Sequence, residues 1–388
     1  MKKFKFLFFI YFLLLVFLTL YSFTQIDLNL TLSRVSLWQK IEKAFMYLGY
    51  FRRPLSTAIY LAILFLLFTF YFLLLRLIER KKVEKKEMWL LIFLTGGILF
   101  FSYPAFSHDL FNYIFDAKIV AFYHRSPYQF KPLDFPDDPM TRFMHWTHRP
   151  SVYPPFWIGL SVIPFVLGFN KFLLQLFLFK AMTAGFYLGT IWLIWKISER
   201  LAPQQKILNA AFYAFNPLVL IESLVSAHND GIMTFFALFA FYLLLKKKPF
   251  ASVGAWLFSI GIKYTTLVLL PVFSFAFWPK IRVKKVDYQK LIVMAILAMY
   301  IAVFIISYRL EFQPWYLLWV LPFVALRLRN RLLFWLTATF SLSSLFRYTP
   351  FLYYGHWNPP IPAIKFWLTV LPVGLGFIIC LIKKYATR

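Results

Sequence analysis

Apolar segments of about 20 residues recur along the whole chain, separated by short polar connections. Each is long enough to cross the roughly 30 Å hydrocarbon core of a bilayer as a helix, whereas a transmembrane β-barrel would show short alternating strands. The pattern predicts an all-α polytopic membrane protein, a bundle of about 11–13 transmembrane or re-entrant helices. The apolar segments lie near residues 6–24, 55–78, 88–106, 152–169, 172–195, 207–226, 231–245, 250–278, 291–307, 315–326, 332–349 and 363–382.

No linker or low-complexity segment divides the chain, so residues 1–388 are interpreted as one integral-membrane domain. Its expected parts are N-terminal helices with an interfacial segment (1–106), an external loop (107–150) and the remaining membrane helices (151–388). Residues 25–53 carry aromatic side chains typical of an amphipathic segment lying in the membrane interface. The first apolar segment follows a basic start but lacks a small-residue cleavage site, so we expect a retained helix and not a signal peptide.

The distribution of charge along the chain predicts an orientation in the membrane. The chain is 61% hydrophobic and 15% charged, with a formal net charge of +27. Lys and Arg gather at both termini and in short connections, which the positive-inside rule assigns to the cytoplasm. The loop 107–150 carries five Lys/Arg and five Asp and is neutral overall, as expected of an external face. The basic excess therefore follows from topology, both termini are predicted to be cytoplasmic, and no nucleic-acid partner is expected. The basic connections are 79–87, 196–206, 246–248, 280–290 and 327–331.

One part of this topology is inconsistent with the positive-inside rule. Two apolar segments, 152–169 and 172–195, separate the external loop from the basic connection 196–206, and two full crossings would leave that connection outside. Incomplete segments at membrane depth are tolerated where they line a cavity. One of these two segments, or the segment 207–226 that Pro217 interrupts, is therefore predicted to be re-entrant or incomplete. The sequence does not decide which.

Asp109 follows the end of an apolar segment and opens the external loop. If 109–123 is helical, Asp109, Tyr113 and Asp116 are spaced four and three residues apart and share a face. A charge at the mouth of a membrane segment is costly, which favours a functional role. Asp also commonly caps a helix N-terminus, and taken alone capping is the more frequent role at such a position. Both interpretations stay open.

A second group of polar residues follows the interrupted segment. Glu222, His228, Asn229 and Asp230 fall within nine residues, shortly after the break at Asn216–Pro217. Discontinuous helices of this kind flank intramembrane sites. Asp230 again has the alternative role of capping the helix that follows it.

Lys263 is the only charge within the segment 250–278. Because that segment begins and ends at basic connections, it is predicted to be a hairpin of two short halves that turns near Gly261–Tyr264. Lys263 then either extends to the interface or holds a lipid phosphate. Further along, Trp315 and Tyr316 are either interfacial anchors or a platform that stacks on a sugar.

Together these stretches resemble the GT-C glycosyltransferases, integral membrane enzymes that take sugars from polyprenyl-phosphate donors. The resemblance is to the branch that includes the GPI mannosyltransferase catalytic subunit and bacterial α-mannosyltransferases. It runs in order over about residues 107–320, and its motifs are HDLFNYIFDAKIVAFYHRSPY, which starts at His108, the Tyr153–Pro154–Pro155 helix start, NP…HND and QPWYLLW. The turn carries His124–Arg125 where that family commonly has Gly.

The resemblance implies a transfer of a sugar, most often mannose, to a lipid-linked or glycan acceptor on the outer face, with inversion at the donor's anomeric carbon. Asp109 is the candidate base, with Asp230 and His228 as further catalytic residues. Lys263 is the leading cation for the donor phosphate, followed by Arg149, Arg309 and Arg347. Sugar or acceptor contacts are assigned to His108, Tyr113, Asp116, Tyr153, Asn229, Gln313, Trp315 and Tyr316.

No cofactor is required by this interpretation, and a role for a divalent cation stays open. The expected partners are the polyprenyl-phosphate donor, the acceptor and membrane lipids. Two other functions also fit a membrane bundle with polar residues: a transporter or flippase of a lipid-linked or anionic solute, and a scaffold without chemistry. The absence of an inverted repeat and the gathering of polar residues on one face favour the enzyme.

Overall fold

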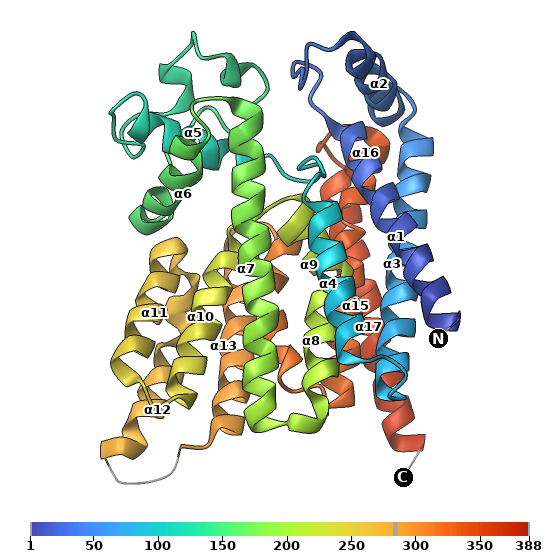
Figure 1. Cartoon of the computed structure of the whole chain (residues 1–388), viewed down its shortest axis with the longest axis vertical. Coiled ribbons are helices and arrows are strands. Elements are labelled where there is room, and N and C mark those ends of the chain that lie inside the picture. The colour runs from blue at the N-terminus through green and yellow to red at the C-terminus, as the bar shows by residue number, and fades with distance from the viewer. Residues whose placement is uncertain (1, 282–285, 387–388) are drawn as a thin grey trace.

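The computed structural model describes residues 2–281 and 286–386. Within these ranges it is helical and has no strand, which confirms the all-α polytopic class. Long helices run side by side, and shorter helices and loops gather at one end of the bundle (Figure 1). The basic residues Arg282, Lys284, Lys285 and Arg388 of the predicted cytoplasmic connections lie outside the described residues.

The N-terminal part of the chain forms helices that pack against the rest of the bundle through tyrosine hydroxyls. The hydroxyl of Tyr60 donates to the Leu345 carbonyl, and that of Tyr71 donates to the Phe212 carbonyl. The predicted interfacial segment contains α2, which lies at the end of the bundle where the loops gather (Figure 1). The helices of this part are α1 (Lys2–Ser22), α2 (Ser36–Met46), α3 (Arg53–Glu79) and α4 (Lys85–Leu99).

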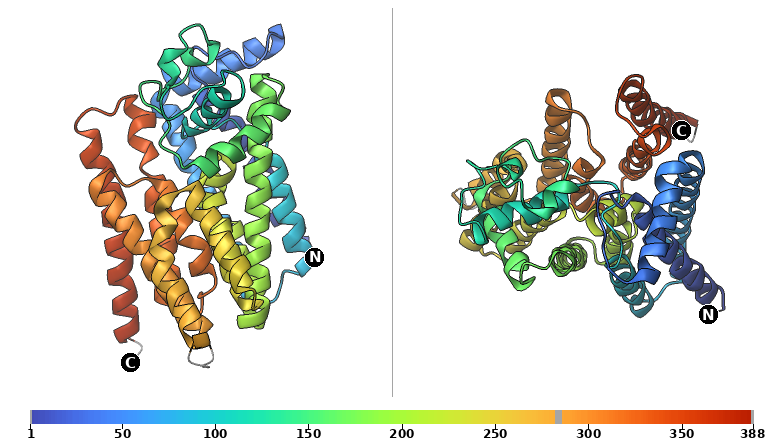
Figure 2. Two further views of the ribbon diagram at one scale, coloured as in Figure 1. Left: turned by 90° about the vertical axis from the view of Figure 1, so that its left-hand side faces the viewer. Right: turned by 90° about the horizontal axis from the view of Figure 1, so that it is seen from above.

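The loop 107–150 is an ordered unit built on α5 (Asp109–Ala121). Its second half is held by the buried carboxylate of Asp138, which accepts a hydrogen bond from Tyr123 at 2.7 Å and pairs with Lys118. Figure 2 shows this loop above the end of α11 (Pro249–Ile262), which the helix after the loop contacts. The loop therefore presents α5 to the bundle as a fixed surface.

The helix after the loop, α6 (Pro155–Leu167), has 13 residues, and at 1.5 Å per residue it is only about 20 Å long. It lies beside α5 at one end of the bundle, whereas α7 (Phe172–Leu201), with 30 residues, extends to the other end (Figure 1). The segment 152–169 therefore forms a helix too short to reach the other end of the bundle. The connection 196–206, which follows α7, lies at the end of the bundle opposite the loop (Figure 1).

The segment after α7 is broken at Pro217, as its sequence predicts. Helix α8 (Lys206–Ala214) is followed by the short α9 (Pro217–Val219) and a π-helical turn (Leu220–Val225), and the two parts are bent by 49°. The side chain of Asn216 accepts a hydrogen bond from the Leu218 amide and so replaces a bond lost at the break.

The end of the π-helical turn is held by a fully buried lysine on α7. Lys180 donates to the carbonyls of Leu224 and Val225, at 2.8 and 3.3 Å, and to the hydroxyl of Ser102 at 2.8 Å. An ammonium has three N–H donors, so these three acceptors account for all of them. These hydrogen bonds thus fix the position of Val225, the residue from which the next turn begins.

The C-terminal half completes the bundle. The segment 250–278 is a hairpin, as predicted, with its break at Lys263, where the backbone is extended. Among residues 2–281 and 286–386, five helices are long and apolar enough to span a membrane, and the bent pair would make a sixth. The elements of this half are α10 (Asp230–Leu245), α11, a 3-10 helix (Tyr264–Leu269), α12 (Leu270–Ile281), α13 (Tyr288–Arg309), a second 3-10 helix (Pro314–Trp319), α14 (Leu321–Ala325), α15 (Arg331–Leu345), α16 (Tyr348–Tyr354) and α17 (Ile361–Ala386).

Candidate active site

Asp109 is the first residue of α5, and its carboxylate faces a buried histidine. The N-cap position belongs to His108, and no side chain caps the helix, so Asp109 does not act as the cap. Its Oδ2 atom lies 3.6 Å from Nδ1 of His228, and its side chain is 17% exposed. The Asp109 side chain is thus partly exposed to solvent and also contacts a residue in the interior of the bundle.

His228 lies between two carboxylates. Its Nε2 atom is 3.4 Å from Oε2 of the fully buried Glu222, whose other oxygen accepts a hydrogen bond from the Tyr348 hydroxyl at 2.9 Å. The imidazole stacks on the indole of Trp315, with 4.2 Å between ring centroids. Asp109, His228, Glu222 and Tyr348 therefore form a continuous polar line that runs from the pocket into the bundle.

The turn that carries His228 is held in a strained backbone conformation. Ala227 has a φ of 58°, in the left-handed region that side-chain-bearing residues seldom adopt and that costs of order 1–3 kcal/mol. Such strain persists where surrounding contacts impose it, and it is concentrated at functional sites. Here Ala227 lies two residues after Val225, whose carbonyl is held by Lys180.

Asp230 and Lys263 form an ion pair beside this turn. The ammonium of Lys263 lies 2.8 Å from Oδ1 of the fully buried Asp230, and the indole N–H of Trp319 donates to the same oxygen. Asp230 is the first residue of α10 and, like Asp109, does not cap its helix. The pair joins the break in the 250–278 hairpin to the start of α10.

Several polar atoms of this cluster are buried without a hydrogen-bond partner among the described residues. They include Nδ2 of Asn229 and Oδ2 of Asp230, and also both ring nitrogens of His228 and Oε2 of Glu222. The side-chain oxygen Oδ1 of Asn229 already has a partner, since it accepts a hydrogen bond from the Tyr113 hydroxyl at 3.2 Å. Buried polar atoms are normally paired, so atoms left open in a cluster of this kind are suited to bind a ligand.

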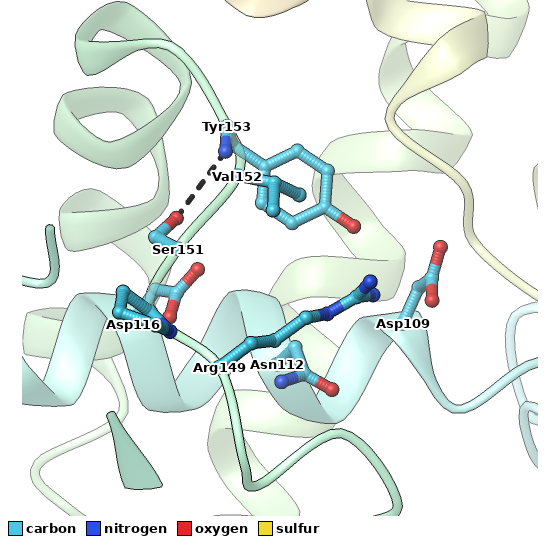
Figure 3. A pocket seen from close by; sticks show the side chains of 8 residues that line it. Asp109, Asn112, Asp116, Arg149, Ser151, Val152 and Tyr153 are labelled. Carbon is cyan, nitrogen blue, oxygen red and sulfur yellow. Dashed lines mark hydrogen bonds between the residues drawn. The ribbon is translucent and has the colours of Figure 1, made fainter.

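A polar pocket opens next to Asp109 (Figure 3). The guanidinium of Arg149 extends across it toward Asp109, and Asp116 lies at the other end. Burial raises the pKa of the Asp116 carboxyl to about 7, although hydrogen bonding to Ser151 and the charge of Arg149 oppose the rise. The pocket is lined by Asp109, Asn112, Asp116, Arg149, Pro150, Ser151, Val152 and Tyr153.

Aromatic rings surround the cluster. The ring of Tyr113 makes edge-to-face contacts with Tyr153 and Trp157, at 5.0 and 4.9 Å between centroids. On the other side the ring of Tyr316 lies 4.7 Å from that of Trp319. Flat apolar rings beside carboxylates are the surface that carbohydrate rings require, because one face of a sugar is apolar and its hydroxyls are polar.

Several predicted site residues lie elsewhere. His108 stacks on His145 at 3.6 Å, and burial together with that neighbour lowers its pKa to about 4. His145 in turn pairs with Asp27, so His108 connects the loop to the N-terminal segment. Arg309 is exposed at the end of α13. Gln313 is the residue before the 3-10 helix 314–319.

Arg347 belongs to a separate cluster with Glu311 and Lys365. Tyr348 and Trp319, which contact Glu222 and Asp230, were not singled out in the sequence. Trp319 had a signal there, because it falls one helical turn after Trp315, whereas Tyr348 had none. Among residues 2–281 and 286–386, no group of three or more His, Cys, Asp and Glu side chains is arranged to hold a metal ion.

A family model described as alpha-(1->6)-mannopyranosyltransferase, N-terminal domain, matches residues 22–279. The chain belongs to this family. It is therefore a glycosyltransferase of the GT-C mannosyltransferase type, as the sequence resemblance implies, and the transporter alternative is not favoured. The match contains α5, the 226–230 turn and Lys263, while Trp315 lies beyond it. Neither the curated proteins nor the solved structures gave a significant match.

Proposed function

We propose that this mannosyltransferase takes mannose from a polyprenyl-phosphate donor and transfers it, with inversion, to a lipid-linked or glycan acceptor on the extracytoplasmic face of the membrane. The observation that carries the proposal is the contact between Asp109 and His228 at the edge of a polar pocket. In this arrangement the Asp109 carboxylate is accessible to a substrate from the pocket and is oriented by His228 from the interior of the bundle.

Asp109 acts as the base. Its carboxylate accepts the proton of the acceptor hydroxyl as that oxygen attacks the anomeric carbon of mannose, while the bond from that carbon to the donor phosphate breaks. His228 holds the carboxylate in place through its Nδ1 atom and is itself held by Glu222. Attack opposite the leaving phosphate inverts the anomeric carbon.

The leaving phosphate needs positive charge. Arg149 lies in the pocket with Asp109, and its planar guanidinium suits two oxygens of one phosphate. Lys263 lies on the other side of the 226–230 turn. Because an ammonium has three N–H donors, Lys263 can hold Asp230 and a phosphate oxygen at the same time. Both cations would oppose the charge that develops on the departing group.

The sugar is proposed to bind between the aromatic rings and the two unpaired amide and carboxylate atoms. Trp315 and Tyr316 would stack on an apolar face of mannose, and Nδ2 of Asn229 and Oδ2 of Asp230 would bind its hydroxyls. The site is proposed to face outward because the basic connection 196–206 ends at the opposite end of the bundle from α5 (Figure 1).

The test is transfer by purified protein in lipid, given polyprenyl-phosphate [¹⁴C]mannose and a membrane glycolipid extract. Wild type is compared with Asp109→Asn and with Asp137→Asn, a matched control that removes an exposed carboxylate of the same loop. We expect the control to transfer like wild type and Asp109→Asn to lose about 10²–10⁴-fold in rate. Equal transfer by all three would remove Asp109 as the base. Transfer from a glucose donor and not from mannose would overturn the donor assignment.

A further inference from the structure

A second group of charges lies away from the Asp109 pocket. The Glu311 carboxylate oxygen Oε1 lies 2.7 Å from the Arg347 guanidinium and 2.7 Å from the Lys365 ammonium. The two cations are deeply buried, with side chains 5% and 8% exposed, whereas the Glu311 side chain is 48% exposed. A carboxylate on a connection between helices thus covers two cations that are fixed in the bundle.

The charges of this cluster do not balance. Arg347 and Lys365 carry two positive charges against the single negative charge of Glu311. The remaining contacts of Arg347 are neutral, since it donates to the Lys365 carbonyl and to the Thr369 hydroxyl. Its Nε atom is buried and has no hydrogen-bond partner among the described residues. Because an unpaired buried charge is costly, the cluster is suited to an anion of higher charge than a carboxylate.

The position of the cluster indicates where that anion comes from. Lys365 is the fifth residue of α17, and its ammonium is 4.3 Å from the ring of Trp357. The rings of Tyr353, Tyr354 and Trp357 are each about half exposed around it. Exposed Tyr and Trp at the end of a membrane helix mark the headgroup level of a bilayer, where lipid phosphates lie. Basic pockets between membrane helices at this level bind lipid headgroups.

We propose that Arg347 and Lys365 form a binding site for the phosphate group of an anionic lipid, and that Glu311 occupies this site until the phosphate displaces it. A phosphate monoester carries close to two negative charges and several acceptor oxygens, which matches two cations and the open Nε atom. The site is separate from the Lys263–Asp230 pair, since the two sets of contacts share no residue. One link to the active-site line is Tyr348, which follows Arg347 in the chain and contacts Glu222.

The alternative is that the three residues are a structural ion triad. The two cases differ in how removal of the Glu311 charge changes the affinity for phosphate. If Glu311 competes with a phosphate, removing its charge strengthens phosphate binding. If the triad is only structural, the same change weakens the fold and leaves phosphate binding as it was.

The experiment measures binding of a sugar-free polyprenyl phosphate and of inorganic phosphate to protein in phosphatidylcholine nanodiscs. All variants carry Lys263→Met with Asp230→Asn, which removes both charges of that pair, and Arg149→Gln, so that neither cation proposed for the donor phosphate contributes. Glu311→Gln is compared with Glu79→Gln, a matched control that removes a carboxylate paired with Arg331 elsewhere in the bundle. Lys365→Gln serves as the second test variant, because it leaves Arg347 and Glu311 as a balanced pair and therefore spares the fold.

We expect Glu311→Gln to bind polyprenyl phosphate about tenfold more tightly, Lys365→Gln to bind it about tenfold more weakly, and Glu79→Gln to be unchanged. We also expect polyprenyl phosphate to raise the melting temperature of Glu311→Gln more than that of its parent. Unchanged or weaker binding by Glu311→Gln would overturn the proposal. Equal affinity for inorganic phosphate would overturn the lipid as its source. Neither result depends on mannose transfer, so the outcome is independent of the proposed function.

Discussion

The Nδ1 atom of His228 lies 3.6 Å from the carboxylate of Asp109, although one residue lies in a turn, the other begins α5, and they come from distant parts of the chain. On its other side the same imidazole lies 3.4 Å from Glu222. A neutral imidazole carries one N–H and can donate to only one of these carboxylates, whereas the protonated form donates to both. The geometry therefore makes Glu222 a positioning residue, because it acts on Asp109 through His228.

Replacing Glu222 by Gln should lower the turnover number by about tenfold, the effect expected when the close polar contact that orients His228 is weakened. The KM for the donor should change little, because Glu222 is buried beneath His228 and does not line the pocket. Steady-state kinetics of mannose transfer check this. The control is Glu199→Gln, which changes a partly exposed carboxylate near the C-terminal end of α7. A rise in KM at constant turnover would contradict the positioning role.

The role of Lys263 can be separated from that of its ion-pair partner Asp230 by comparing single and double variants. Lys263→Met leaves the fully buried carboxylate of Asp230 without its cation, which typically costs about 3–5 kcal/mol. Asp230→Asn combined with Lys263→Met removes both charges, so the melting temperature should recover most of the loss. Transfer activity should not recover, because the proposed phosphate cation is still absent. If the double variant were as active as wild type, Lys263 would be no more than a counter-ion.

The pH dependence of stability should contain a contribution from Asp116. Its pKa is about 7 in the folded chain against 3.8 for the model carboxyl, so the folded state binds more protons between these values. Stability should therefore fall as the pH rises from about 4 to 7 and then level off. Melting temperatures across this range should show that decline in wild type and a flatter profile in Asp116→Asn. Parallel profiles would show that Asp116 is not buried as described.

Two glycines should respond in opposite ways to the same substitution. A Cβ atom on Gly49 would lie 1.8 Å from the Thr24 carbonyl oxygen, so Gly49→Ala must displace backbone and should strongly destabilise the protein. Gly96 lies within α4 with nothing within 4 Å of its added Cβ, so Gly96→Ala should be neutral or stabilise by up to about 1 kcal/mol. Melting temperatures of the two variants check the contrast. A tolerated Gly49→Ala would mean that the 47–51 turn does not pack on Thr24.

Local patterns predicted much of the fold. The length of the apolar segments gave the helices, the lone charge at Lys263 marked the break of a hairpin, and Pro217 marked the bent pair. The short length of α6 also had a signal, since its sequence starts at Pro154–Pro155 and reaches Gly168 before the next apolar segment. What the sequence left open was only the choice among three incomplete candidates, because each is tolerated where it lines a cavity.

The candidate site was harder to predict, because its contacts join distant parts of the chain. The acids and His228 stood out as charges in apolar surroundings, but nothing local indicates that Glu222 lies against His228 or that Tyr348 lies against Glu222. Capping was the more frequent role for Asp109, and the helix start decided against it, because His108 is the N-cap residue and no side chain caps α5. Arg347 was grouped with Lys263 by charge alone, whereas the packing of α16 and α17 gives it Glu311 and Lys365 as partners.

The buried Lys180 has a consequence for how the protein is made. Its acceptors Leu224 and Val225 are synthesised 44 and 45 residues after it, which at about 5–20 residues per second is a delay of several seconds. During that interval Ser102 is its only structural partner already present. A lone lysine inside a membrane segment costs about 2.5–3.5 kcal/mol in insertion measurements. The full set of Lys180 hydrogen bonds can therefore form only after Leu224 and Val225 have been synthesised, so the final packing of α7 waits for a segment that follows it in the chain.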